Sequence, residues 1–207
     1  IERGYKFNIW CYSRVDTVKE QYLETLKKAG VNWLALGIES GNSRVRKDVT
    51  KGRFEDVDIR SVVQKIRGHD INVIANYIFG LPEDDLATMQ TTLDLALEMN
   101  TEEANFYSAM AYPGSPLYGQ AVTEGWKLPD CYAGYSQHSY DAQPLPTKYL
   151  RAEQVLEFRD NAWMRYHTNP QFLDLLKKKF GSMAADETVR STQIKLKRKI
   201  LEKARVS

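Results

Sequence analysis

The chain has 207 residues, of which 43% are hydrophobic and 27% charged, and its formal net charge is +2. These values are typical of a folded globular protein and exclude a disordered tail or a fibrous repeat. No stretch approaches the ~18 consecutive apolar residues of a membrane span, and the first residues lack a signal-peptide core, which together predict a cytoplasmic protein.

The apolar residues from position 6 to 110 repeat with a period that switches between about 2 and about 3.6, which indicates alternating strands and helices. The expected strands are 7–12, 32–38, 71–79 and 104–109. The first expected helix begins at a capping box formed by Thr17 and Glu20 and ends at Gly30. A second helix is expected around 59–66, and a third begins at Pro82–Asp85.

Strands that are almost continuously apolar and joined by helices are typical of a parallel sheet with both faces covered. Four strands make half a barrel, and a complete eight-stranded barrel needs about 250 residues. The alternatives are an open sheet or part of a barrel, and we favour a partial parallel (β/α) barrel of the TIM-barrel type. Because the chain starts at Ile1 and soon enters strand-like sequence, we expect it to be a piece of a longer protein.

The second half of the chain has a different composition. Residues 112–147 are rich in Pro, Gly and Tyr and predict a long ordered loop. Three helical stretches follow, so the expected organisation is a half-barrel over 1–118, an aromatic loop over 119–147 and a helical extension over 148–207. The last 22 residues hold seven basic and three acidic side chains. Such a tail can contact RNA, but it has no interleaved aromatic residues to stack bases, which favours a solvated helix face.

Polar residues follow each predicted strand, where ligands bind in parallel α/β folds. Arg14, Glu39 and Asn76 follow three of the strands, with Lys51 and Arg53 in a nearby loop. These groups suit a zwitterionic ligand that carries hydroxyl groups. The alternative is that they only satisfy the backbone of the loops.

Four runs of sequence occur in the order and spacing of known motifs. They are Gly37-Ile38-Glu39-Ser40-Gly41-Asn42, Lys51-Gly52-Arg53, Ile78-Phe79-Gly80-Leu81-Pro82-Glu83-Asp84 and Tyr112-Pro113-Gly114-Ser115-Pro116-Leu117-Tyr118. Together they resemble the later core motifs of the radical S-adenosylmethionine (SAM) superfamily, over about residues 5–118. The resemblance looks closest to the branch with an upstream cobalamin-binding domain, or to the related methylthiotransferases.

The resemblance implies that the chain supplies strands three to six of a six-stranded partial barrel. It also implies an enzyme that cleaves SAM reductively to a 5'-deoxyadenosyl radical, with a [4Fe-4S] cluster and possible cobalamin as cofactors, for methyl transfer, cyclisation or rearrangement. In the superfamily a CxxxCxxC loop ligates the cluster. This sequence has only Cys11 and Cys131, so no metal ligand is expected in it, and Cys11 is interpreted as a buried strand thiol.

The implied partners are a small-molecule substrate, the missing N-terminal half of the polypeptide, and an electron donor such as flavodoxin or ferredoxin. The isolated chain is expected to be inactive.

The resemblance assigns SAM contacts to residues at the strand ends. Arg14 faces SAM, or instead forms a salt bridge with Asp16 or Glu39. Glu39, with the adjacent Ser40, contacts the ribose or amino-acid part. Lys51 binds the carboxylate, with Arg53 as its competitor.

Asn76 bonds the ribose hydroxyls in this comparison, or is a buried amide that bridges neighbouring strands. Met110, Ala111 and Tyr112 lie against adenine.

In the aromatic loop, Tyr135, His138 and Tyr140 are candidate substrate contacts, or only pack the loop onto the barrel. No catalytic residue is predicted. The alternatives to a methyltransferase or cyclase are an RNA-modifying methylthiotransferase and a non-catalytic α/β ligand-binding module.

Overall fold

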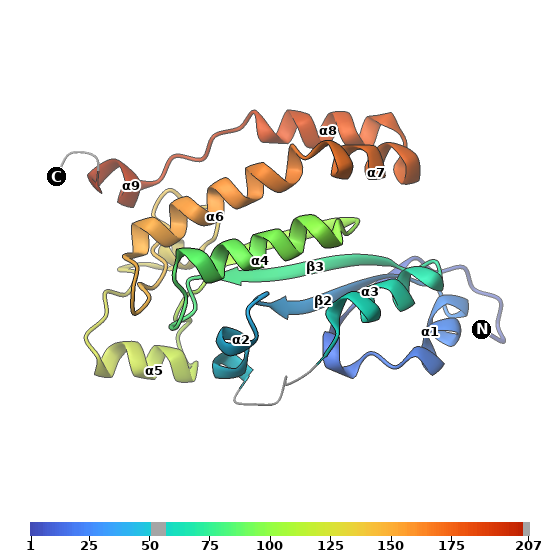
Figure 1. The fold of residues 1–207 in the computed structure, drawn as a ribbon, viewed down its shortest axis with the longest axis horizontal. Coiled ribbons are helices and arrows are strands. Elements are labelled where there is room, and N and C mark those ends of the chain that lie inside the picture. Colours follow the sequence, from blue (N-terminus) through green and yellow to red (C-terminus); the bar gives the residue numbers. More distant parts are fainter. Residues whose placement is uncertain (51–56, 205–207) are drawn as a thin grey trace.

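The core of the chain is a four-stranded parallel sheet. A computed structural model describes residues 1–50 and 57–204. The strands are β1 (Ile9–Arg14), β2 (Val31–Glu39), β3 (Asn72–Phe79) and β4 (Glu103–Ser108). They lie in the order β1-β2-β3-β4, so each strand pairs with the one before it in the chain (Figure 1). The predicted parallel α/β fold is confirmed.

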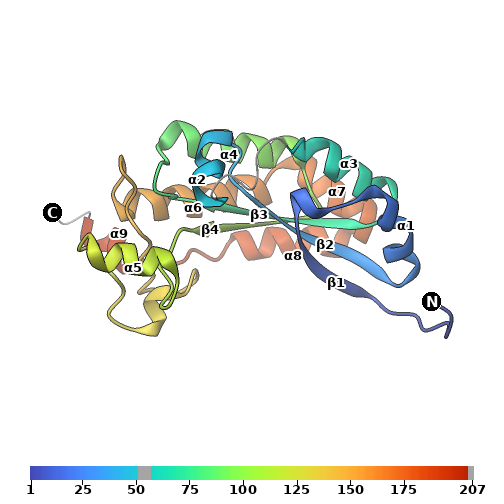
Figure 2. The same ribbon diagram turned by 90° about the horizontal axis from the view of Figure 1, so that it is seen from below.

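Helices connect successive strands and cover one face of the sheet, as Figure 2 shows. They are α1 (Glu20–Lys28), α2 (Ser43–Thr50), α3 (Ile59–Gly68) and α4 (Leu86–Met99), and a 3-10 turn, η1 (Val15–Thr17), precedes α1. The Asp58 side chain caps α3 by accepting from the Ser61 N–H. Asp85 and Thr88 form a capping box at the start of α4. These caps satisfy amide groups that the first turn of a helix leaves without partners.

Two predicted helix starts were wrong. Thr17 lies in the 3-10 turn, and α1 has Lys19 as its N-cap with no side-chain bond, so Thr17 and Glu20 do not form a capping box. The helix expected at Pro82 begins four residues later, at Leu86. Asp84 instead accepts hydrogen bonds from the N–H groups of Gly80 and Leu81, which makes Pro82–Asp85 a turn that leads into the helix.

The hydrophobic core lies between the sheet and the connecting helices. Alternate residues of β2, β3 and β4 point into it, and three of them form an aromatic stack: the Phe106 ring lies 5.5 Å from that of Tyr77 and 5.7 Å from that of Phe79. Each fully buried large apolar side chain contributes about 1.5–3 kcal/mol. The residues between them point to the opposite face, which we call the inner face of the sheet.

The second half of the chain runs from the end of β4 through a long loop, which contains α5 and a 3-10 turn, into the four helices α6 to α9. The elements are α5 (Pro116–Thr123), a 3-10 turn η2 (Tyr132–Tyr135), α6 (Ala152–His167), α7 (Pro170–Phe180), α8 (Ser182–Thr192) and α9 (Lys199–Ala204). Helix α5 lies in a stretch predicted to be loop, and it is capped by Ser115, with Pro116 in its first turn. Helix α6 packs along β4, at the edge of the sheet opposite β1.

Candidate functional site

A line of residues crosses the inner face near the carboxyl ends of the strands. In the strand register Arg14 is paired with Gly37, Gly37 with Asn76, and Asn76 with Asn105. Residues paired across neighbouring strands point to the same face. The sheet therefore brings Arg14 and Asn76, both predicted from the sequence, into one row around Gly37, and we call Arg14, Gly37, Asn76 and Asn105 the rim row.

The Glu39 side chain lies beside the rim row because β2 is irregular at this point. The pairing of β2 with β3 shifts between Gly37 and Glu39, and Glu39 has a left-handed backbone with φ of 65°. A Cβ atom on Gly37 would lie 2.7 Å from Oε1 of Glu39, so the carboxylate lies directly over Gly37. A left-handed conformation costs a non-glycine residue about 1–3 kcal/mol and is concentrated at functional sites. A side chain at Gly37 would displace the Glu39 carboxylate from this position.

Burial raises the pKa of the Glu39 carboxyl above its usual range. Water solvates this group poorly, so the ionised form is costly until a positive or hydrogen-bond-donating group reaches it. An ammonium group or a pair of hydroxyls is the kind of ligand that would lower this cost.

Asn76 is buried and holds three strands together. Its Nδ2 donates to the carbonyl of Leu36 at 3.1 Å, and its Oδ1 accepts from Nδ2 of Asn105 at 3.1 Å. These are the contacts of a strand-bridging amide, which was the alternative to a ribose contact. Sequence reasoning missed Asn105, although its position between the core residues Ala104 and Phe106 already indicates that it faces away from the core.

Arg14 forms a bidentate ion pair with Asp16 at the end of β1, with Nε donating to Oδ1 at 3.0 Å. Its side chain is 49% exposed. The guanidinium is therefore oriented by a neighbouring carboxylate.

Ser40 faces away from the rim row. Its side chain is fully buried, and its hydroxyl lies 3.2 Å from the Thr92 hydroxyl on α4. The Ser40 carbonyl accepts from Arg46 at 2.7 Å. Through its contact with Thr92, the Ser40 side chain joins the loop after β2 to helix α4. Lys51 and Arg53 lie outside the described residues.

The residues expected to lie against adenine follow β4. Met110 packs with Ala142 and Leu156, and Ala111 is also buried. Tyr112 is 48% exposed, and its ring lies 5.9 Å from that of Tyr135.

Of the other two candidate substrate residues, Tyr140 contacts the helical extension. Tyr140 donates from its hydroxyl to Glu202 of α9 at 2.7 Å. The His138 residue as a whole is exposed. Its imidazole is partly buried, and this burial, together with the nearby Arg159 and Arg198, lowers the pKa of the imidazole. The structure thus gives Tyr135 and Tyr140 packing contacts within the loop and its neighbours.

The described residues do not fit an iron-sulfur cluster. Cys11 lies half-buried on β1 against the core, and Cys131 is exposed in the loop. Residues 1–50 and 57–204 contain no group of three or more His, Cys, Asp or Glu side chains that could hold a metal ion. The rim row and Glu39 instead bring a poorly solvated carboxylate, a guanidinium and amide groups together, a combination that suits a zwitterionic ligand with hydroxyl groups.

Comparison of the sequence with models of known protein families identifies a similar family. The family model described as the radical SAM superfamily matches residues 4–96, which include β1 to β3 and the rim residues Arg14, Glu39 and Asn76. The part of the chain that contains β1 to β3 is therefore similar to the radical SAM superfamily. Members of this superfamily use SAM and a [4Fe-4S] cluster.

Its relatives include methyltransferases. The chain is 23% identical over 172 residues to an uncharacterized methyltransferase from Pyrococcus horikoshii, covering 83% of this chain and 37% of that protein. It is 26% identical over 100 residues to the bacteriochlorophyllide d C-12(1)-methyltransferase of Chlorobaculum tepidum, covering 48% of this chain and 22% of that protein. The chain therefore spans 37% of the length of the first relative and 22% of the length of the second.

A solved structure shares the fold of part of this chain. It is the radical SAM methyltransferase TsrM from Kitasatospora setae with cobalamin and a [4Fe-4S] cluster bound. The TM-score is 0.50 at 18% identity, and the match covers 56% of this chain and 23% of TsrM. At this identity the likeness is one of fold. No helix within residues 1–50 and 57–204 is long and apolar enough to cross a membrane.

Proposed function

We propose that this chain forms the SAM-binding rim of a radical SAM enzyme of the methyltransferase type. The observation that carries the proposal is the Glu39 carboxylate held over Gly37, in line with Arg14 and Asn76. The carboxylate would accept from the ammonium or the ribose hydroxyls of SAM, and Arg14 would pair with its carboxylate. Asn76 positions the row, since its amide is already bonded to β2 and β4.

The whole enzyme would cleave SAM reductively to start methyl transfer, cyclisation or rearrangement of a small-molecule substrate. We propose that its cluster ligands lie in a CxxxCxxC segment outside these 207 residues, because the described cysteines do not suit the cluster. The isolated chain would then bind SAM without turning it over. Cobalamin and an electron donor of the flavodoxin or ferredoxin type belong to the same proposal.

A small-molecule substrate is favoured over RNA because basic side chains of the tail are already bonded to acidic residues of the chain. The Arg198 side chain is buried and bonded to Asp160, and Lys199 pairs with Asp141 at 3.0 Å. Two of the tail's basic groups are thus engaged inside the chain. The alternative of a non-catalytic α/β ligand-binding module predicts the same fold but no iron-sulfur cluster in the whole protein.

The test is SAM binding to the protein that carries this chain, measured by calorimetry with the Glu39→Gln variant. A hydrogen bond to a charged group contributes about 1.5–3 kcal/mol, so we expect affinity to fall about 10- to 100-fold. Wild-type binding should also weaken at acidic pH, and this should begin at a higher pH than an ordinary glutamate would give, because the pKa of Glu39 is raised. Glu24→Gln, at an exposed residue of α1, is the matched control.

Stability separates a binding role from a folding role. Because the pKa of Glu39 is raised in the folded chain, the folded state binds the proton more tightly, and stability decreases as pH rises through that pKa. Glutamine resembles the protonated form, so Glu39→Gln should be more stable than wild type at neutral pH while binding SAM less tightly. Unchanged affinity in this variant would refute the proposed role of Glu39.

A further inference from the structure

Two buried arginine side chains share one carboxylate beside β4. The side chains of Arg159 and Arg198 are 5% and 1% exposed. Arg159 Nη1 donates to Asp160 at 2.8 Å, and Arg198 donates to both oxygens of the same carboxylate at 2.9 Å. Among the described residues, Asp160 is the only acid that bonds to either guanidinium. One buried positive charge is therefore left without a counterion, which is costly inside a protein.

The two guanidiniums differ in what they still offer to a ligand. Besides the shared carboxylate, Arg198 donates to the carbonyls of Ser139 and Gln137 at 2.8 and 3.0 Å, so it is engaged within the chain. Arg159 uses Nε on the carbonyl of Phe106 at 2.7 Å and Nη1 on the shared carboxylate. Its Nη2 bonds to none of the described residues and is not fully buried. Nη2 of Arg159 is thus the donor that an incoming anion can use.

The side chain of Tyr107 lies next to the Arg159 guanidinium. Arg159 binds the carbonyl of the peptide bond that joins Phe106 to Tyr107. Tyr107 points to the inner face, because it lies two residues after Asn105 of the rim row. Its pKa is raised by partial burial and by the neighbouring Tyr12 phenol, and lowered to a smaller extent by Arg159. The Tyr107 hydroxyl bonds to none of the described residues, so it can donate to a ligand on the inner face.

His138 is the third polar group at this place. It follows Gln137, whose amide pairs with the N–H and the carbonyl of Ser108 at 2.9 and 3.0 Å, and this holds the His138 backbone beside the end of β4. Because its pKa is lowered, the imidazole is neutral at neutral pH and can donate one N–H without adding a positive charge. We call Arg159, Tyr107 and His138 the β4 cluster.

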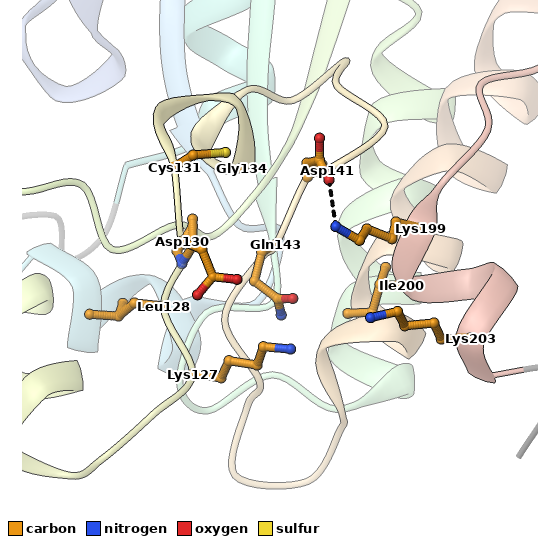
Figure 3. A pocket seen from close by; sticks show the side chains of 12 residues that line it. Lys127, Leu128, Asp130, Cys131, Gly134, Asp141, Gln143, Lys199, Ile200 and Lys203 are labelled. Atoms are coloured by element: carbon orange, nitrogen blue, oxygen red, sulfur yellow. Dashed lines mark hydrogen bonds and ion pairs between the residues drawn. The ribbon is translucent and has the colours of Figure 1, made fainter.

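A cavity next to helix α9 is a weaker candidate for an anion. It measures about 130 Å³ and lies between the loop over 127–143 and α9 (Figure 3). Its Lys199 is already paired with Asp141 at 3.0 Å, and the Asp130 carboxylate lines the same cavity. An anion there would meet two carboxylates. In the β4 cluster, by contrast, the one nearby carboxylate is already shared by two guanidiniums.

We propose that the β4 cluster binds the carboxylate of a small-molecule substrate. Nη2 of Arg159, the hydroxyl of Tyr107 and the imidazole of His138 donate to its two oxygens. Bonds of this kind are charge-assisted and stronger than neutral ones. One negative charge balances the single excess positive charge, which favours a carboxylate over a doubly charged phosphate. The assignment to the substrate rests on the proposed function, because Tyr107 shares the inner face with the rim row, whereas the anion site itself does not.

His138 supplies the probe for the first test. Diethylpyrocarbonate acylates neutral imidazole, and its rate at His138 is measured by mass spectrometry of the whole protein, with the His69 peptide as internal reference. Acetate should slow this reaction saturably, relative to chloride at equal ionic strength. In Arg159→Met we expect the acetate concentration for half-protection to rise about 10- to 100-fold. Lys127→Met removes an exposed positive charge from the loop and is the matched control, which should leave the protection unchanged.

Tyr107→Phe tests the site while leaving the contacts of Arg159 with the edge of β4 in place. It removes only a hydroxyl, and we expect the acetate concentration for half-protection to rise about two- to tenfold. Tyr22→Phe, at an exposed position of α1, should have no effect. Thermal unfolding of each variant shows whether it is folded. If Arg159→Met does not fold, Tyr107→Phe decides the test.

The other outcomes are equally specific. Equal slowing by chloride, no slowing by acetate, or protection that is unchanged in Arg159→Met and Tyr107→Phe would overturn the proposal. Stronger protection by inorganic phosphate than by acetate would overturn the assignment to a carboxylate. Acetate protection that saturating SAM abolishes would assign the site to the carboxylate of SAM and not to a substrate. Acetate protection in a protein that binds no SAM would refute the proposed function and leave the anion site standing.

Discussion

The two edge strands of the sheet differ in how far other parts of the chain cover them. At β4, the Arg159 Nε donates to the carbonyl of Phe106 at 2.7 Å, and the amide of Gln137 pairs with both the N–H and the carbonyl of Ser108 at 2.9 and 3.0 Å. At β1, β2 is the only described strand neighbour, and the side chains near this edge are open, with Trp10 53% and Tyr12 71% exposed. Side chains can therefore replace a missing strand at one edge while the other keeps its capacity to pair.

The covered edge depends on how α6 meets the end of β3, and Gly80 decides that contact. Gly80 has φ of +80°, and a Cβ there would lie 2.3 Å from Cγ1 of Val155 on α6. Gly80→Ala adds backbone strain and a clash, and we expect it to lower the free energy of unfolding by about 3–5 kcal/mol in denaturant titration. Gly68→Ala is the control: it has no atom within 4 Å of the added Cβ and should gain about 0.5 kcal/mol. Equal effects at the two glycines would contradict this account.

Gln137 carries the second test of the covered edge. Gln137→Leu keeps the volume of the side chain but leaves the buried N–H and carbonyl of Ser108 without partners. We expect a loss of about 2–4 kcal/mol and faster hydrogen exchange at the Ser108 amide. Gln120→Leu, at an exposed position of α5, should change stability by less than about 0.5 kcal/mol. A Ser108 amide that stays protected in the Gln137 variant would show that another group caps the strand.

The open edge should respond to substitution in a different way. Trp10→Lys removes an exposed ring that contacts Tyr12 at 4.8 Å between centroids, so we expect stability to change by less than about 0.5 kcal/mol. A charge on an edge strand opposes pairing with other chains, so the variant should self-associate less in sedimentation experiments. A large loss of stability would mean that this edge is already covered in the whole protein.

The comparison also shows which features were predictable from the sequence. The periods of the apolar residues located all four strands, and the strand ends indicated Arg14, Glu39 and Asn76, because these signals are local. Helix α5 was missed although Ser115 and Pro116 are a recognisable helix start, since the Pro and Gly content of the surrounding segment suggested loop.

Other features depend on contacts between distant parts of the chain. The carboxylate of Glu39 lies over Gly37 only because β2 departs from regular geometry, which no periodicity reveals. Arg159 and Gln137 reach β4 from positions 53 and 29 residues away, respectively. Arg198 belongs to the basic tail, but its side chain is buried and bonded to Asp160 on α6, 38 residues away in the sequence. Long-range polar pairs of this type carry no local pattern.

The order of the strands has a consequence for synthesis of the protein. Because each strand pairs with the one made just before it, the sheet can grow by one unit at a time as the chain leaves the ribosome. The edge of β4 is complete at Ser108, but the helix that covers it ends only at His167. At about 5–20 residues per second, that edge stays uncovered for roughly 3–12 seconds in every round of translation. During this interval the nascent chain is most exposed to mispairing and to the chaperones that prevent it.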